Sequence, residues 1–172
     1  MSELSFNTPN GAVVDRPLLI AYLNTSTTAS PTWSPFGKRV EDSSMEMDWG
    51  DNSSQDILGN GFTTMRKPVI TQTFDPWTLD SSEAAQKKIW NLAVREQNVP
   101  ALTNQDVLIV HFYAGTADTA VFAERYESCA VRPTGLGGSE TVDMPVDVTY
   151  GGKRSTGTAA ATAGVVTFTP DA

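Results

Sequence analysis

The sequence predicts a mainly β protein, a β-sandwich or barrel with one α-helix on its flank. Three observations support this fold class. Apolar and polar residues alternate with a period of two over residues 142–150, which is typical of a half-buried strand. Turn-forming Gly, Pro, Asn and Ser residues separate most of the apolar segments. Only residues 81–98 carry an apolar pattern of helical period, so the helix is a single layer beside strands.

The part of the chain before the helix reads as strands joined by polar turns. Residues 12–23 and 69–74 favour strands, and residues 24–35 form a polar loop that contains prolines. Met45, Met47 and Trp49 share one parity, which predicts a half-buried strand. Residues 51–62 are predicted to be a turn region, because Asn60-Gly61 is a strong turn signal.

The helix is the most clearly marked local element. Asp80 is placed to cap it, and Glu83 three residues later completes a capping-box pattern. Pro100 lies just beyond its end, where a helix does not continue. Its predicted apolar face consists of Ala85, Ile89, Leu92 and Ala93, at spacings of three and four.

The chain after the helix returns to strands. Residues 106–114 are apolar on both parities, which predicts a central strand covered on both faces. Residues 119–131, 142–150 and 165–169 are further strands. Since domains run to about 100–200 residues, the 172 residues are predicted to form a single domain, residues 1–172. Within it, residues 1–35 combine a strand with a polar loop of the kind that often becomes ordered only on assembly.

Composition excludes several classes of protein. Twelve Lys and Arg against twenty Asp and Glu give a net charge of −8. The basic residues occur singly or as isolated pairs and form no cluster, so strong nucleic-acid binding is not expected. No apolar run approaches the roughly 20 residues that cross a bilayer, and the first residues do not form a signal-peptide pattern. One cysteine excludes an internal disulfide.

Residues with catalytic chemistry are few. His111 lies in the most apolar segment and Cys129 lies mid-strand, so both are expected to be packed rather than reactive. Residues 51–56 lack the glycine and the final glutamate of a calcium loop, and no helix follows the glycines of residues 135–138. We therefore expect no catalytic residue, no metal site and no cofactor. A pair of carboxylates for glycoside hydrolysis keeps a small hydrolase as a distant alternative.

The four tryptophans raise a second alternative, a carbohydrate-binding module. Trp49 and Trp90 stand at positions typical of a core, which leaves Trp33 and Trp77 as candidate surface platforms for a sugar.

Acidic residues cluster where basic ones are absent. Residues 40–65 hold six acids and residues 133–152 hold three. Neither range contains a Lys or an Arg. Within the alternating segments these acids take the parity opposite the apolar side chains. They form either an ordinary solvated face or, if several copies align side by side, a continuous acidic wall.

The sequence resembles the major tail tube proteins of tailed bacteriophages, of the siphophage type. The resemblance extends from Val40 to the end of the chain and includes the order of the elements. The stretches that carry it are residues 40–60, 67–76, 89–93, 122–126 and 134–152.

The resemblance implies a non-enzymatic structural subunit in the tail of a virion, made in the cytoplasm of the bacterial host. Its copies would close into hexameric rings, and the rings would stack helically into a hollow tube. DNA would pass through without specific binding, and no membrane would be involved. Further partners would be other tail proteins, namely the tape measure, distal tail and terminator proteins. A virion or capsid decoration protein is the alternative within the same class.

The resemblance also suggests which residues act in assembly. Exposed sheet edges would pair between neighbouring subunits. Carboxylates on the bore would repel phosphates within about 8 Å at physiological salt. The acids predicted to face the bore are Glu46, Asp48, Asp143 and Asp147. The loops of residues 24–35 and 51–62 are predicted to contact the next ring, through Asn24, Trp33, Asp51, Asn52, Asp56 and Asn60.

Overall fold

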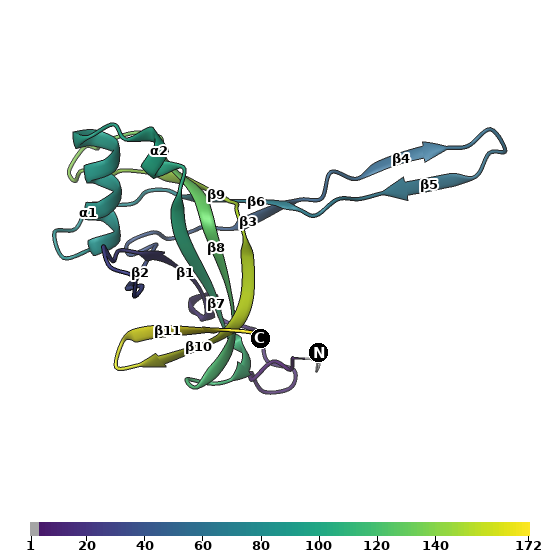
Figure 1. Ribbon diagram of the computed structural model, residues 1–172, viewed down its shortest axis with the longest axis horizontal. Coiled ribbons are helices and arrows are strands. Elements are labelled where there is room, and N and C mark those ends of the chain that lie inside the picture. The colour runs from purple at the N-terminus through teal and green to yellow at the C-terminus, as the bar shows by residue number, and fades with distance from the viewer. Residues whose placement is uncertain (1–3) are drawn as a thin grey trace.

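A long bent sheet forms most of the molecule. The computed structural model describes residues 4–172, so the first three residues of the predicted N-terminal segment lie outside the described part. Nine strands join in the order β2-β1-β7-β8-β9-β6-β3, with β10 and β11 branching from β8 (Figure 1). All the pairings are antiparallel. The strands are β1 (Leu19–Asn24), β2 (Trp33–Pro35), β3 (Met45–Asp48), β6 (Val69–Phe74), β7 (Gln105–Thr116), β8 (Ala120–Pro133), β9 (Val146–Tyr150), β10 (Arg154–Thr162) and β11 (Val165–Pro170).

Strand β8 joins the part of the sheet that contains β10 and β11 to the part that contains β9, β6 and β3. One of its edges pairs with β7, while the other pairs first with β10, from Val121 to Tyr126, and then with β9, from Ala130 to Pro133. The outer strands β2 and β11 both contribute side chains to one core, so this half of the sheet curls towards a barrel. The predicted fold class, mainly β with a flanking helix, is confirmed.

Two hydrophobic clusters lie on opposite faces of β7. Val107 and Ile109 belong to the larger cluster, which also holds side chains of β6, β9 and the helix. Leu108 and Val110 belong to the smaller cluster beneath β10 and β11. All four side chains are fully buried. A strand that is covered on both faces carries apolar side chains at successive positions instead of alternating with polar ones. This confirms the prediction for residues 106–114.

The helical layer is shorter than predicted. α1 (Ala84–Trp90) continues directly into the π-helical turn η2 (Asn91–Arg95), and α2 (Val99–Leu102) follows. A single 3₁₀ turn, η1 (Arg16–Leu18), precedes β1. Ala85 and Ile89 are fully buried against the sheet, as their spacing predicted, but the helix spans residues 84–95 rather than 81–98.

The predicted capping box is wrong. Glu83 occupies the N-cap position, but its side chain accepts a hydrogen bond from Lys38 and none from the helix amides, and Asp80 accepts hydrogen bonds from the amide and hydroxyl of Ser82 instead. The buried amide of Gln86 ties the preceding loop to the helix, since it accepts from the Asp80 amide and donates to the Thr78 carbonyl. These contacts delay the helix start to Ala84.

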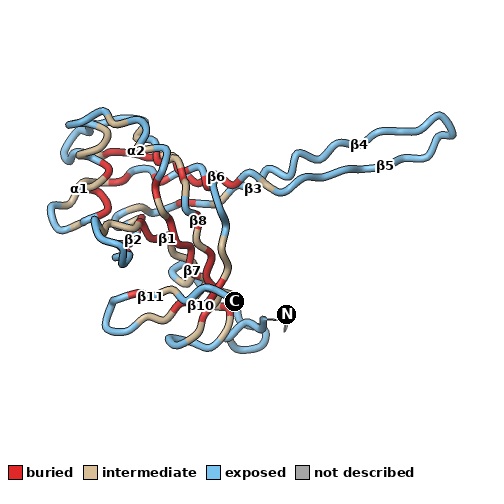
Figure 2. The backbone as a smooth tube through the Cα atoms, viewed as in Figure 1, coloured by how far each residue is buried: buried red, intermediate tan, exposed pale blue. Residues whose placement is uncertain are grey.

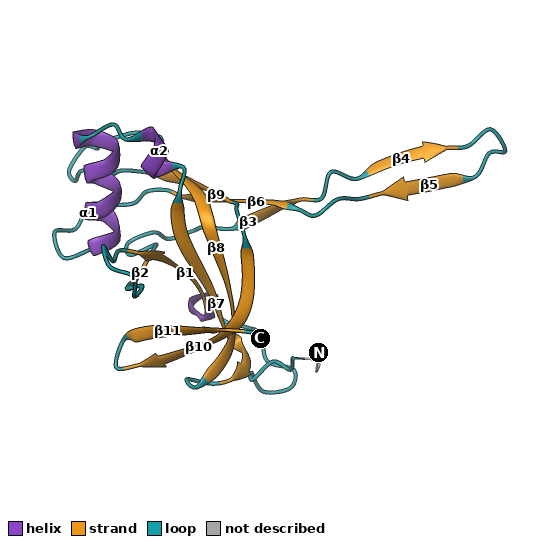
Figure 3. Ribbon diagram, viewed as in Figure 1, coloured by secondary structure: helices purple, strands orange, loops and turns teal. Residues whose placement is uncertain are grey.

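A second, two-stranded sheet projects from the body as a long arm. Its strands are β4 (Asn52–Gln55) and β5 (Gly61–Thr64), which follow on from β3 and precede β6 (Figure 3). The sequence predicted this region only as a turn. The strands were missed because both faces of the arm lie in solvent, so their residues show no apolar alternation.

The predicted roles of the tryptophans are reversed. Trp77 is 1% exposed and packs against Phe36 with ring centroids 5.2 Å apart, and Trp33 is 8% exposed in the smaller cluster. Trp49 and Trp90 are exposed. The half-buried face predicted for Met45, Met47 and Trp49 is found only at Met45. Met47 pairs with the buried Ile70 but is itself 52% exposed.

Among residues 4–172, no helix combines the length and the apolar character that crossing a membrane requires.

Candidate functional site

The arm stands apart from the body of the protein. Residues 49–67 are all exposed, and Figure 2 shows the arm in pale blue along its whole length. At its base the amide of Arg66 donates a hydrogen bond to the carbonyl of Trp49 at 3.0 Å. An exposed two-stranded hairpin is only marginally stable in water, so contact with another molecule would stabilise an arm of this kind.

The tip of the arm is a structured turn. One carboxylate oxygen of Asp56 accepts hydrogen bonds from the amides of Leu58, at 2.9 Å, and of Asn60, at 2.8 Å. Its other oxygen accepts from the side-chain amide of Asn60 at 3.0 Å. These hydrogen bonds, those from Asn60 first, lower the pKa of Asp56. The turn therefore holds Ile57 and Leu58 in one arrangement.

Apolar side chains concentrate on this arm. Ile57 and Leu58 at the tip are 102% and 81% exposed, and Phe62 and Met65 lie exposed along the returning strand. Scattered apolar residues are normal on protein surfaces, but their concentration on one projecting element makes the arm our candidate interaction surface. The polar residues predicted for an inter-ring loop share the arm: Asp51, Asn52, Asp56 and Asn60.

A groove lies at the base of the arm, where β3 and β6 meet β8, β9 and β10. Its volume is about 710 Å³. Aromatic rings of Trp49, Tyr126 and Tyr150 line it together with apolar side chains of Met47 and Ile70. Its charged lining residues are Lys67, Glu124 and Arg154.

Glu124 is the buried anion of this groove. Its Oε2 accepts hydrogen bonds from Arg154 Nε, at 2.7 Å, and from the hydroxyl of Tyr126, at 3.1 Å. Its Oε1 lies 3.0 Å from Nε2 of His111. Burial opposes ionisation more than any one partner favours it, but the contacts with His111 and Arg154 together lower the pKa of Glu124. Burial of the ring, together with the same carboxylate, raises the pKa of Tyr126 to about 12.

His111 and Cys129, which the sequence predicted to be packed, both lie within the sheet. The other ring nitrogen of His111 is 2.9 Å from the hydroxyl of Tyr113. Cys129 is fully buried, and burial raises the pKa of its thiol to about 12, so it stays protonated at neutral pH. Within residues 4–172, no three His, Cys, Asp or Glu side chains are placed to hold a metal ion.

Three of the four acids predicted for the bore share one face of the sheet. Glu46 pairs across the ladder with Thr71 and Asp147 pairs with Thr73, so both lie on the face opposite the core. Asp48 has the same parity as Glu46 on β3. Asp143 lies outside the strands, in the connection that precedes β9, where its backbone exchanges hydrogen bonds with Gly137.

Two of these carboxylates are paired with cations. Asp147 lies 2.7 Å from Arg132 and accepts a hydrogen bond from Thr73 at 2.8 Å, and these contacts lower its pKa. Asp48 lies 3.1 Å from Arg66. The pairing reduces the net negative charge of this face, an effect that the strand pattern alone did not indicate.

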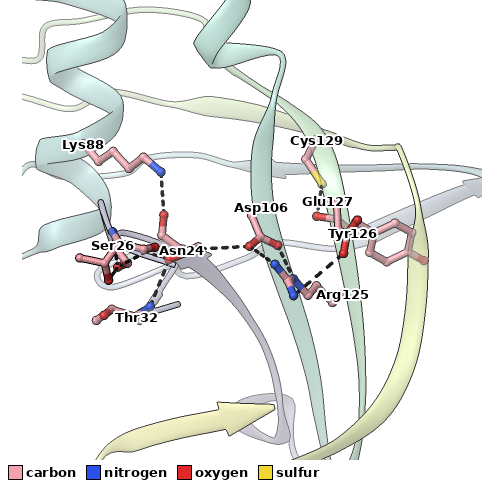
Figure 4. A network of polar contacts seen from close by, with 10 residues as sticks. Asn24, Ser26, Thr32, Lys88, Asp106, Arg125, Tyr126, Glu127 and Cys129 are labelled. Atoms are coloured by element: carbon pink, nitrogen blue, oxygen red, sulfur yellow. Dashed lines mark hydrogen bonds and ion pairs between the residues drawn. The ribbon is translucent and has the colours of Figure 1, made fainter. Parts of the chain in front are cut away.

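Asn24 and Trp33 lie in the body, far along the chain from the arm residues with which they were grouped. The side chain of Asn24 accepts from the amides of Ser26 and Thr32 and donates to Asp106, while its carbonyl accepts from Lys88 at 2.7 Å (Figure 4). Asp106 in turn makes a bidentate pair with Arg125, whose guanidinium lies 5.8 Å from the Trp33 ring centre. These contacts fix the loop that follows β1 to the sheet.

The groove and its charged pair were missed by sequence reasoning. Glu124 and Arg154 are 30 residues apart, and the ladder between β8 and β10 alone brings them together. The signal that was available is a charged residue inside an otherwise apolar strand, since such residues are usually paired when buried.

Comparison with solved structures finds chains of similar fold from contractile injection systems. One belongs to the PVC sheath–tube complex in the extended state (TM-score 0.48, 10% identity), covering 86% of this chain and 93% of that one. Another belongs to the PVC sheath/tube terminator (TM-score 0.48, 11% identity), covering 86% and 99%. A third is the tube-terminating cap of the anti-feeding prophage (TM-score 0.46, 15% identity), covering 89% and 96%. No family model and no curated protein matches the sequence.

Proposed function

We propose that the chain is the structural subunit of a phage tail tube, in which hexameric rings stack helically around a bore that conducts DNA. The observation that carries the proposal is the arm. It exposes Ile57 and Leu58 at a tip that Asp56 holds in order, and these side chains leave water only when another molecule covers them. A repeating assembly supplies such a molecule at every position, because each subunit meets a copy of itself.

Lateral contacts have their own support. Strand β3 forms one edge of the sheet and pairs with β6 on one side only, within the described residues. An unpaired edge of this kind can add a strand from a neighbour, and a closed ring leaves no such edge free. Head-to-tail rings then combine with stacking through the arm to give a tube.

The face that carries Glu46, Asp48 and Asp147 is our candidate for the bore, with Asp143 at its margin. Carboxylates there prevent the phosphate contacts that would hold DNA. Their range is about 8 Å at physiological salt, so they would act as a lining and not as a long-range pump. Asp48 and Asp147 are paired with Arg66 and Arg132, so Glu46 supplies most of the uncompensated charge on the strands of this face.

The carbohydrate-binding alternative loses its basis in the structure. Trp33 and Trp77, its two candidate platforms, are buried in the hydrophobic clusters. A stacking platform for a sugar needs an exposed ring face.

Negative-stain microscopy of the concentrated, purified chain tests the proposal. A tube subunit gives rings or hollow filaments with a regular repeat, and its sedimentation depends on protein concentration. A decoration protein or a binding module stays as discrete particles at every concentration. Discrete particles, with and without phage tail extracts to initiate assembly, would contradict the proposal.

A further inference from the structure

We infer that the groove at the arm base receives the arm tip of a second copy of this chain, with Ile57 and Leu58 inserted beside Trp49, Tyr126 and Tyr150. The inference rests on the proposed tube function and names the receiving surface for the arm.

The two surfaces are complementary in apolar character. The tip offers two aliphatic side chains on a turn of five residues, and the groove of about 710 Å³ offers three aromatic rings and two aliphatic side chains. Aliphatic groups that pack against aromatic rings remove apolar surface from water on both partners, which is the main favourable contribution to association.

The two surfaces are also complementary in charge. The arm carries the carboxylates of Asp51 and Asp56 and has no basic residue between them. Among the charged residues of the groove, Glu124 and Arg154 neutralise each other, so Lys67 supplies the net positive charge. Opposite charges at the rim of an apolar contact select its register and speed its formation.

A chain cannot fill its own groove in this fold. Trp49 lines the groove, and Ile57 lies eight residues further along an extended strand, which at about 3.3 Å per residue places the tip roughly 26 Å away. Figure 1 shows the arm directed away from the body. Tip and groove are therefore different patches of one surface, and a contact between them is head-to-tail. Head-to-tail contacts either close into a ring or propagate as an open filament, and the axial contact of a tube is of the second kind.

Disulfide cross-linking between two singly substituted proteins tests this contact. Leu58→Cys provides the tip thiol and Met47→Cys the groove thiol, because Met47 pairs with Ile70 on the face that carries Tyr150, and both positions are exposed enough to react. Cys129 is fully buried and does not compete. Leu136→Cys is the matched control, because Leu136 is a similarly exposed apolar residue outside the groove lining. The proteins are mixed under mild oxidation, and the products are separated on a non-reducing gel while the same samples are examined by microscopy.

The expected result is a covalent dimer in the mixture of Leu58→Cys with Met47→Cys, at least tenfold more abundant than with Leu136→Cys. Equal yields with the two partners would overturn the inference. Filaments that form without cross-linking to Met47→Cys would overturn the groove assignment and leave the tube proposal standing. A selective cross-link without filaments at any concentration would support the groove and contradict the tube. A chain that gives neither would overturn both.

Discussion

The carboxylate of Glu124 accepts a hydrogen bond from the guanidinium of Arg154 at 2.7 Å. The contact joins β8 to the first residue of β10, and His111 of β7 meets the same carboxylate from the other side. Three adjacent strands are thus held at one buried point, on the wall of the groove that we assign to the arm tip.

Glu124→Gln should destabilise the fold. The substitution keeps the shape of the side chain but removes the charge that Arg154 and His111 meet in a largely buried position. Hydrogen bonds to charged groups contribute about 1.5–3 kcal/mol, and the partial exposure of Arg154 lowers the expected loss to about 1–2 kcal/mol. Urea unfolding at pH 7 measures it. Glu127→Gln, three residues along the same strand and exposed, is the control, and an equal loss there would contradict the assignment.

The contribution of Glu124 should also depend on pH. Its pKa is lowered below the ordinary value of 4.5, so folding favours the ionised form. The stabilisation is therefore complete above about pH 4.5 and is lost as the pH falls through the lower pKa of the folded state. The difference in unfolding free energy between wild type and Glu124→Gln should shrink between pH 5 and pH 3. A difference that stays constant over this range would show that charge is not its source.

The double variant Ile57→Ser, Leu58→Ser should abolish assembly and leave the fold intact. Full burial of each aliphatic side chain is worth about 1.5–3 kcal/mol, so the loss of both should weaken association more than a hundredfold. The melting temperature should not change, because neither side chain touches the body. Sedimentation velocity and thermal unfolding measure the two effects. Val165→Ser removes a comparably exposed apolar residue from β11 and should assemble normally.

Asp56→Ala should weaken assembly without touching the apolar contact itself. The substitution removes the acceptor of three hydrogen bonds that order the tip, so the turn must then be ordered during docking. We expect the concentration required for assembly to rise several-fold and the melting temperature to stay the same. Asp51→Ala, which removes one arm carboxylate away from the turn, is the control for charge. If both variants assemble equally poorly, charge and not tip order is responsible.

Replacing all four candidate bore acids by lysine should turn a non-binding lining into one that retains DNA. Tubes of wild type assembled with a labelled duplex should sediment without it, and tubes of the quadruple variant should carry it down in a salt-dependent manner. The control has the same change in net charge on other exposed acids, Glu96, Glu127, Glu140 and Asp171. DNA retention by the control tubes alone would place the bore on a different face.

The sequence predicted well where pattern and burial coincide. Residues 106–114 are apolar on both parities because both clusters press on β7, and Ile89 fell on the buried helix face. The predicted start of the helix was wrong because the Asp80 carboxylate does not accept hydrogen bonds from the helix amides. It accepts a hydrogen bond from the hydroxyl of Ser82 and pairs with Lys38 instead. Such local competition is not visible in spacing.

The candidate site was harder to predict than the fold. The arm carries no alternation, because neither of its faces is covered, so Asn52 and Gln55 read as loop residues. Met47 and Trp49 show the opposite error. Their alternation with acidic residues predicted a buried face, but both side chains are exposed because no other element within residues 4–172 packs on that face. The wall of the groove depends on pairing between β8 and β10, which is a property of the folded sheet.

The continuity of the arm with the sheet determines how the molecule bears load. Strands β3 and β6 run straight into the two strands of the arm, and β6 is bonded to β9 through five residue pairs, from Ile70 with Tyr150 to Phe74 with Val146. A pull on the tip along the arm is thus parallel to these strands and perpendicular to their hydrogen bonds. The hydrogen bonds between β6 and β9 are therefore loaded in shear and bear the force together. Such a pair of strands resists tension far better than one whose hydrogen bonds break one after another from one end.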